Sequence, residues 1–248
     1  MCSLVLLLRP CGRWPLVIAA NRDEMRERPS RPPGRHWPDR PEVVGGLDLV
    51  AGGSWLAMSD RGMVAAVLNR RGSLGPAAGK RSRGELVLEA LDHADADAAA
   101  RALLDLDPAA YRPFNLVIAD RERAFWLRHA GGGRITLHPL AEGVRMLTST
   151  ELDDPACPRI RRYRPLFARS LPADGDWSDW QFLLGSTASD SGDPRHAMCI
   201  RTDTGYGTVS ASILALPADP GAPPVWLYAD GPPDEAPFLP VSPANASP

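Results

Sequence analysis

The chain has 248 residues, a formal net charge of -2, 44% hydrophobic residues and 23% charged residues. This length suits one large domain or two small ones, and the composition is that of a globular protein with a core of useful size. The near-neutral charge gives no indication of a nucleic-acid partner. The four cysteines form no CxxC pair and no histidine cluster stands at metal-ligand spacing, so we expect neither a zinc site nor any other metal site.

The first residues contain one short apolar run, Leu4 to Leu8. No basic segment precedes this run, and it is too short for a signal peptide or a membrane span. It is typical of a buried strand. We therefore expect a cytoplasmic protein that does not span a membrane.

Hydrophobic periodicity and turn residues predict a chain in which groups of strands and groups of helices follow one another. A turn at residues 10–12 joins the first two strands, and a polar loop rich in Pro and Arg covers Asn21 to Trp37. The predicted strands are Cys2–Leu8, Leu16–Ala20, Leu47–Ala51, Trp55–Ser59, Met63–Leu68, Phe114–Ala119, Ala124–Arg128, Ile135–Leu137, Arg145–Thr148, Ala197–Arg201, Thr208–Leu216 and Val225–Tyr228. The predicted helical regions are Arg83–His93, Ala94–Leu106, Pro158–Ser170 and Asp179–Leu184.

This order predicts a layered α+β sandwich with its helices on the outside. Strands and helices do not alternate, and no GxGxxG follows the first strand, which argues against a dinucleotide-binding fold. We expect one domain over residues 1–230 and a Pro-rich C-terminal tail over residues 231–248.

Cys2 is the most informative residue for chemistry. Removal of Met1 would leave a cysteine with a free α-amine, which combines a nucleophile with a base of unperturbed pKa near ~7.8. The alternative interpretation is a small residue buried at the edge of a strand.

The Asn21-Arg22-Asp23-Glu24 segment follows the second apolar strand. If the first two strands form a hairpin, Asp23 lies beside Cys2, where its carboxylate could hold the α-ammonium group. The neighbouring Arg22 would favour a thiolate or bind a substrate carboxylate. A charged loop that solvates the strand end is the other interpretation.

A series of short motifs in the same order resembles a known family. The chain is similar to the NRDE family, which is also called the transport and Golgi organisation 2 family, and the resemblance runs from Met1 to about Leu216. The matching segments are Met1-Cys2, Ala19 to Glu24, Arg28-Pro29, Gly52 to Leu56, Leu68-Asn69, Arg83 to Val87, Phe114 to Leu116 and Tyr206 to Thr208.

The resemblance implies a relative of the N-terminal-nucleophile (Ntn) hydrolases that cleave penicillin V and conjugated bile acids. The implied fold is a four-layer αββα sandwich of mostly antiparallel sheets. Cys2 would be the nucleophile, Asp23 would hold the amine, and Asn69 would face the oxyanion, where a lost donor costs about 100-fold or more in rate. Asn21 and Arg22 complete the predicted catalytic set. Glu24, Trp55, Arg70 and Ser149 are the predicted substrate-binding residues.

The chain departs from the pattern of these hydrolases at three positions. Their Arg precedes the Asp by three positions, where this chain has Ala20, and Arg22 would have to replace it. Their second Asn is expected near residues 147–149, where this chain has Ser149. The family usually has Arg after Tyr-Gly-Thr, where this chain has Val209.

Trp55 has two interpretations. The glycines before it allow close backbone approach, so the indole could line a pocket, but a core tryptophan is the commoner role.

Two functions are consistent with these residues. The first is an amidohydrolase that uses the N-terminal cysteine on a small acyl or amide compound and needs no cofactor. The second is a non-catalytic carrier or chaperone for haem or acyl-coenzyme A, ligands that the resemblance suggests through haem trafficking and lipid metabolism. In the carrier, Arg22, Arg70 and Arg71 would meet propionates or phosphates. Its haem ligand would be Cys2, His36 or Cys157.

Overall fold

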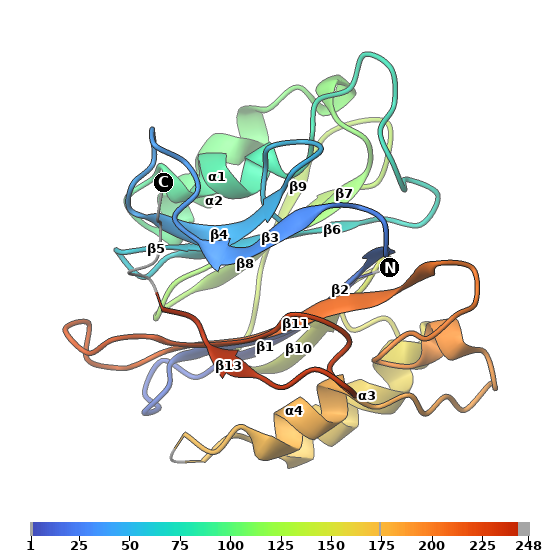
Figure 1. Ribbon diagram of the computed structural model, residues 1–248. Coiled ribbons are helices and arrows are strands. Elements are labelled where there is room, and N and C mark those ends of the chain that lie inside the picture. Colours follow the sequence, from blue (N-terminus) through green and yellow to red (C-terminus); the bar gives the residue numbers. More distant parts are fainter. Residues whose placement is uncertain (1, 174, 243–248) are drawn as a thin grey trace. The chain divides into compact units, whose positions relative to one another are not determined.

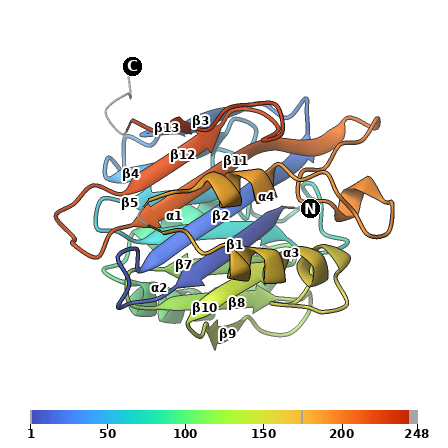
Figure 2. The ribbon, with the colours of Figure 1, turned by 90° about the horizontal axis from the view of Figure 1, so that it is seen from below.

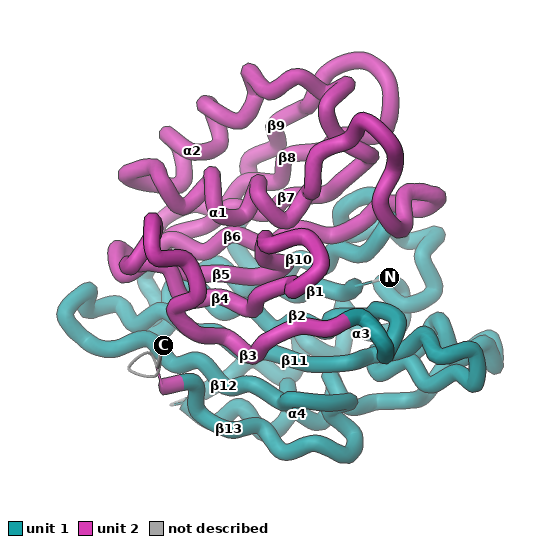
Figure 3. Tube along the Cα trace, turned by 45° about the horizontal axis from the view of Figure 1, so that its top comes forward, with its two compact units in different colours: residues 1–28, 142–241 teal, residues 29–141, 242–248 magenta. Residues whose placement is uncertain are grey.

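The computed structural model describes residues 2–173 and 175–242. Contacts within the chain divide it into two compact units (Figure 3). The first unit combines residues 1–28 with residues 142–241, and the second is made of residues 29–141 together with residues 242–248. The first unit is therefore built from two segments that are far apart in the sequence.

The first unit contains a six-stranded antiparallel sheet, seen nearly edge-on in Figure 1, in the order β10-β1-β2-β11-β12-β13 (Figure 2). The two continuous apolar runs near the N-terminus form neighbouring strands of this sheet, with Leu4 opposite Ala20 and Leu8 opposite Leu16. The strands are β1 (Ser3–Leu8), β2 (Leu16–Met25), β10 (Gly143–Leu147), β11 (Tyr206–Leu216), β12 (Val225–Ala229) and β13 (Leu239–Pro240).

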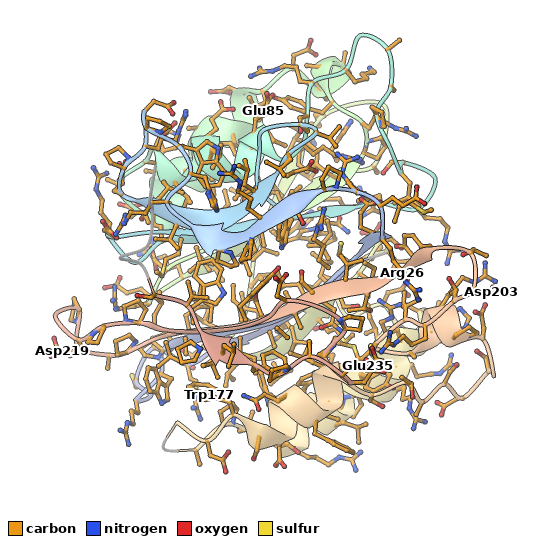
Figure 4. All side chains as sticks on the ribbon, viewed as in Figure 1. Arg26, Glu85, Trp177, Asp203, Asp219 and Glu235 are labelled. Atoms are coloured by element: carbon orange, nitrogen blue, oxygen red, sulfur yellow. The ribbon has the colours of Figure 1, made fainter. Side chains whose placement is uncertain are left out.

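Helices α3 (Pro158–Arg169) and α4 (Ser178–Leu184) lie across one face of this sheet (Figure 2). Helix α3 begins with Pro158, a favoured first helical residue because it needs no hydrogen-bond partner for its nitrogen. The core between helices and sheet joins large aromatic side chains to alternate residues of the strands, and it includes Val5, Val17, Ala19, Tyr163, Phe167, Trp177 and Trp180. Trp177 lies at the start of α4 (Figure 4). A short 3₁₀ helix, η3 (Pro194–His196), precedes β11.

The second unit contains a seven-stranded antiparallel sheet whose strands follow one another in chain order. The strands are β3 (Ser30–Gly34), β4 (Val43–Asp48), β5 (Leu56–Ser59), β6 (Val64–Asn69), β7 (Phe114–Ala119), β8 (Ala124–His129) and β9 (Thr136–Pro139).

Two helices, α1 (Glu85–Leu91) and α2 (Ala96–Ala102), cover one face of the second sheet and share a buried core with it. Glu85 in the first turn of α1 accepts hydrogen bonds from the Tyr111 hydroxyl at 2.7 Å and from the Arg81 guanidinium at 2.6 Å (Figure 4). Two 3₁₀ helices, η1 (Leu103–Asp105) and η2 (Pro108–Ala110), follow α2.

Each unit thus has one antiparallel sheet and its own layer of helices, which confirms the predicted α+β class with two antiparallel sheets. Among the described residues, no helix has the length and apolar character needed to cross a membrane.

The prediction of a loop over Asn21 to Trp37 was wrong in two places. Strand β2 continues through Met25, and β3 begins at Ser30. The polar residues at the end of β2 remain in the sheet because β11 pairs with the strand along its whole length, from Leu16 to Met25. Tertiary pairing therefore overrides the local loop pattern.

The strand predicted over Leu47 to Ala51 lies earlier, over Val43 to Asp48. Gly45 and Gly46 are inside this strand rather than between strands. A Cβ atom on Gly46 would lie 2.3 Å from the Trp55 ring. These glycines thus mark a close approach of side chains and not a turn.

The strand predicted over Ala197 to Arg201 was also wrong, because this segment follows η3 as irregular backbone. Its polar groups are satisfied individually. The Cys199 amide donates to the Ser186 carbonyl at 2.9 Å, and the Ile200 amide donates to the Thr208 hydroxyl at 2.8 Å. An apolar run of this length does not distinguish a strand from a buried irregular segment.

Part of the stretch predicted as a C-terminal tail packs onto the first unit. Strand β13 pairs with β12, and Phe238 packs against the core under α3 and α4. Arg201 donates to Asp234 at 2.9 Å and forms an ion pair with Glu235 at 2.5 Å (Figure 4). Residues 243–248 lie outside the described part of the chain.

Candidate active site

Cys2 lies immediately before β1, at the end of the β1–β2 hairpin. Ser3 is opposite Asn21 in the ladder, so the next step of the antiparallel register places Cys2 opposite Arg22. The Cys2 thiol is half-buried and lies 3.7 Å from the backbone carbonyl oxygen of Asp23, to which it can donate a weak hydrogen bond. The predicted hairpin thus brings Cys2 and Asp23 together.

The Asp23 carboxylate is buried and both of its oxygens accept hydrogen bonds. Oδ1 accepts from the Thr208 hydroxyl at 2.7 Å, and Oδ2 accepts from Nη1 of Arg159 at 3.0 Å. The side chains of Asp23 and Arg159 are 0% and 2% exposed, so this ion pair is fully withdrawn from water. A buried pair with satisfied hydrogen bonds fixes the geometry of both partners. Loss of one partner leaves a buried charge without compensation.

Arg159 connects this carboxylate to the residue after Cys2. Its Nη1 also donates to the Ser3 hydroxyl at 2.5 Å, and its Nη2 donates to the Arg195 carbonyl at 2.6 Å. One guanidinium from α3 therefore joins β1, β2 and η3.

Sequence reasoning missed both Arg159 and Thr208. Arg159 occupies the second helical position of α3, where the helix dipole disfavours a cation. This misplaced charge is a signal in the sequence that its side chain has a partner elsewhere. Thr208 lies within the Tyr-Gly-Thr motif, but its role depends on pairing with Asp23 across the ladder.

A β-bulge interrupts the pairing of β11 with β2 beside Asp23. Thr208 pairs with Asp23 and Ser210 with Arg22, so Val209 is the extra residue. Bulges occur often next to active sites, where they change the direction of a side chain. The Tyr206 hydroxyl donates to the Asp23 carbonyl oxygen at 3.3 Å, so this oxygen is shared by Tyr206 and the Cys2 thiol.

Asn21, predicted as a catalytic residue, lies on the helix-covered face of β2. Its side-chain amide donates to the Leu184 carbonyl at 3.0 Å and to the Met198 carbonyl at 2.9 Å. These bonds tie β2 to the end of α4 and to the segment before β11. A catalytic role for Asn21 stays a prediction, and the contacts give it a structural one.

Arg22 and Glu24 alternate with Asn21 and Asp23 along β2, and therefore point to the opposite face of the sheet. Arg22 is 6% exposed, whereas Glu24 is half-buried and lies 4.0 Å from Arg28. Ser149 is 3% exposed and follows β10, whose Leu147 is opposite Leu4. Ser149 therefore lies in the loop beside the start of β1.

Burial raises the pKa of the Cys2 thiol above its usual value. The nearby Asp23 carboxylate adds to this rise, while the positive charge of Arg22 opposes it. Arg22 thus acts in the direction that its position suggested, but burial is the larger effect. A thiol with a raised pKa needs a base to remove its proton before it can act as a nucleophile.

The remaining predicted site residues belong to the second unit. Asn69 is the last residue of β6, opposite Phe114. Arg70 donates to Oδ1 of Asn115 at 2.7 Å, and Asn115 is completely buried. Trp55 precedes β5 and its ring covers Gly46.

The sequence matches the family model described as Transport and Golgi organisation 2 over residues 1–220. The chain belongs to this family. It is 29% identical over 243 residues to the transport and Golgi organization protein 2 homolog of Bos taurus, a match that covers 85% of this chain and 86% of the relative. It is 37% identical over 124 residues to the Homo sapiens homolog, covering 47% and 43% of the two chains.

Two solved amidase structures have a similar fold. The N-acylethanolamine-hydrolyzing acid amidase ortholog of Caenorhabditis elegans matches with a TM-score of 0.60 and 12% identity, over 90% of this chain and 94% of its own. The mutant C2A of conjugated bile acid hydrolase from Clostridium perfringens matches with a TM-score of 0.56 and 12% identity, over 98% and 97%. The family member described here therefore has an Ntn-hydrolase-like fold.

Proposed function

We propose that this family member is an N-terminal-cysteine amidohydrolase that acts on a small acyl or amide compound. The main support is the position of Cys2 beside Asp23, whose buried carboxylate is held by Arg159 and Thr208. The fold that the chain shares with two amidases agrees with this proposal.

In the proposed reaction, removal of Met1 exposes the α-amine of Cys2. The amine takes the thiol proton, and the sulfur attacks the carbonyl carbon of the substrate. The C–N bond then breaks, the amine product leaves with the proton, and a thioester to Cys2 remains. Water hydrolyses the thioester to a carboxylic acid and restores the thiol.

Hydrolysis of a panel of N-acyl amides by the wild type and by Cys2→Ala tests this proposal. We expect turnover by the wild type, a thioester on the Cys2 peptide in acid-quenched samples, and a loss of several orders of magnitude in Cys2→Ala. Cys11→Ala is the matched control, because Cys11 is exposed in the β1–β2 turn. Hydrolysis that survives Cys2→Ala would contradict a covalent mechanism at this residue.

The carrier function for haem or acyl-coenzyme A remains an alternative proposal. The described residues contain no group of three or more His, Cys, Asp and Glu side chains that could hold a metal ion. His36 Nε2 lies 2.8 Å from the Pro32 carbonyl oxygen, and Cys157 is 3.5 Å from the Thr148 hydroxyl. These contacts favour structural roles for both residues, and their role as haem ligands stays a prediction. Titration with haem and with acyl-coenzyme A, using Arg22→Ala as the variant, tests this alternative.

A further inference from the structure

The buried guanidinium of Arg159 lies beside the start of β1, and its contacts there suggest a role beyond stabilising the fold. It contacts the Asp23 carboxylate and the hydroxyl of Ser3, the residue directly after Cys2. Replacement of a buried ion pair by apolar side chains is often neutral or stabilising, so a buried pair is weak evidence of a purely structural role. This pair lies at the end of the β1–β2 hairpin, where Ser3 is opposite Asn21 and Cys2 immediately precedes β1.

The proposed reaction needs a neutral α-amine on Cys2. In the proposed site the Asp23 carboxylate holds this amine, and an unbalanced buried carboxylate would stabilise the ammonium form and make the amine a poorer base. A guanidinium paired with the same carboxylate cancels most of that charge. The Asp23 carboxylate can then accept a hydrogen bond from the amine without keeping it protonated.

We propose that Arg159 is a positioning residue of this site, which holds the Asp23 carboxylate and Ser3 so that the α-nitrogen of Cys2 is a neutral base. This inference rests on the proposed function. Arg159 lies on α3 and not on the hairpin that carries Cys2. Its effect on the Cys2 amine can therefore be tested by mutation without changing the hairpin.

Other charged and polar groups lie near Cys2 and Asp23 and enter the balance of charge. The Arg22 cation lies on β2 and lowers the pKa of the Cys2 thiol, whereas burial, the larger effect, raises it. From β11 the Thr208 hydroxyl donates to the Asp23 carboxylate, whereas the Tyr206 hydroxyl donates to the Asp23 backbone carbonyl oxygen. From η3 the Arg195 backbone carbonyl accepts from Arg159, while the Arg195 side chain pairs with Asp193 at 2.9 Å.

The α-amine can be titrated directly, without a substrate. The protein is labelled with [¹³C]cysteine, which gives signals for four residues, and Cys2→Ala assigns the Cys2 signals. Their chemical shifts are followed against pH in the wild type, Arg159→Gln and Arg159→Lys. Arg161→Gln is the matched control, since Arg161 is an exposed arginine of the same helix.

We expect the midpoint of the Cys2 amine titration to rise by about one pH unit or more in Arg159→Gln, because the Asp23 charge is no longer balanced. Arg159→Lys should restore most of the wild-type midpoint, and Arg161→Gln should leave it unchanged. If Arg159→Gln does not fold, Asp23→Asn tests the same balance of charge from the other side. This variant removes the negative charge and keeps Arg159, so the midpoint of the Cys2 amine titration should fall.

An unchanged midpoint in Arg159→Gln, or in Asp23→Asn, would overturn the inference and leave Arg159 a structural residue. Amide hydrolysis assayed on the same samples distinguishes the proposed role of Arg159 from the proposed amidohydrolase function. Hydrolysis with unmoved midpoints defeats only the role of Arg159, whereas shifted midpoints without hydrolysis of any amide defeat only the proposed function. Retention of Met1, seen by intact mass, would overturn both.

Discussion

At the scale of single residues, the sequence pointed to Cys2 and Asp23 but not to what holds them. Two apolar runs separated by a short turn are enough to predict the hairpin that brings these residues together. Arg159 is 136 residues from Asp23 along the chain, so no local pattern shows that they form a pair. The sequence showed that Arg22 would lower the pKa of the Cys2 thiol but not that burial raises it by more. Burial depends on the whole fold, so no local pattern reveals it.

Thr208 offers a test of the Asp23 network through stability. Thr208→Val keeps the shape of the side chain but removes the hydroxyl that donates to Asp23 and accepts from the Ile200 amide. We expect a loss of about 1–3 kcal/mol in the free energy of unfolding, because buried polar groups lose their partners. Urea unfolding measures this loss, and Thr204→Val at an exposed position is the control. Equal stability of the two variants would contradict the contacts described for Thr208.

At the scale of elements, the sequence predicted most strands and helices with small errors at their ends. The errors are larger where long-range contacts decide the structure. Residues 21–25 have the composition of a loop, yet they form the end of β2 because β11 pairs with them. Residues 197–201 have the apolar character of a strand, yet they are irregular because their polar groups bond to Ser186, Asn21 and Thr208.

The Cys199 thiol links this irregular segment to the C-terminal stretch. It is completely buried and donates to the Asp234 carboxylate at 3.1 Å. Burial, together with the hydrogen bond to Asp234, raises the pKa of Cys199 to about 12. Above pH ~8.5 the unfolded chain loses the thiol proton while the folded protein keeps it, so stability falls as pH rises towards 12.

We expect this difference to cost the wild type about 2 kcal/mol at pH 10 relative to pH 7.5, because pH 10 lies about 1.5 pH units above the thiol pKa of the unfolded chain. Cys199→Ala should lose that part of the alkaline decline, although it is less stable at pH 7.5. Urea unfolding at both pH values measures the slope, with Cys11→Ala at an exposed site as the control. The account of Cys199 fails if wild type and Cys199→Ala lose equal stability between the two pH values.

At the scale of the whole molecule, the order of strands and helices predicted the α+β class, and the motifs predicted the family. The sequence did not reveal the order of strands within the first sheet, where β2 pairs with β11 from nearly 200 residues away. Such pairing is set by the buried faces of the complete sheet and by its register, which a single sequence does not display. Because the fold is Ntn-hydrolase-like, Cys2 is the candidate nucleophile of the proposed reaction.

Intact mass spectrometry of the purified, unmodified protein shows whether Met1 has been removed, on which the proposed reaction depends. The proposed nucleophile and base both belong to Cys2, and the base exists only if Met1 has been removed. The account predicts a mass equal to that of the chain from Cys2 to Pro248. A mass that includes Met1 would contradict it, because the nitrogen of Cys2 would then be an amide and could not accept the thiol proton.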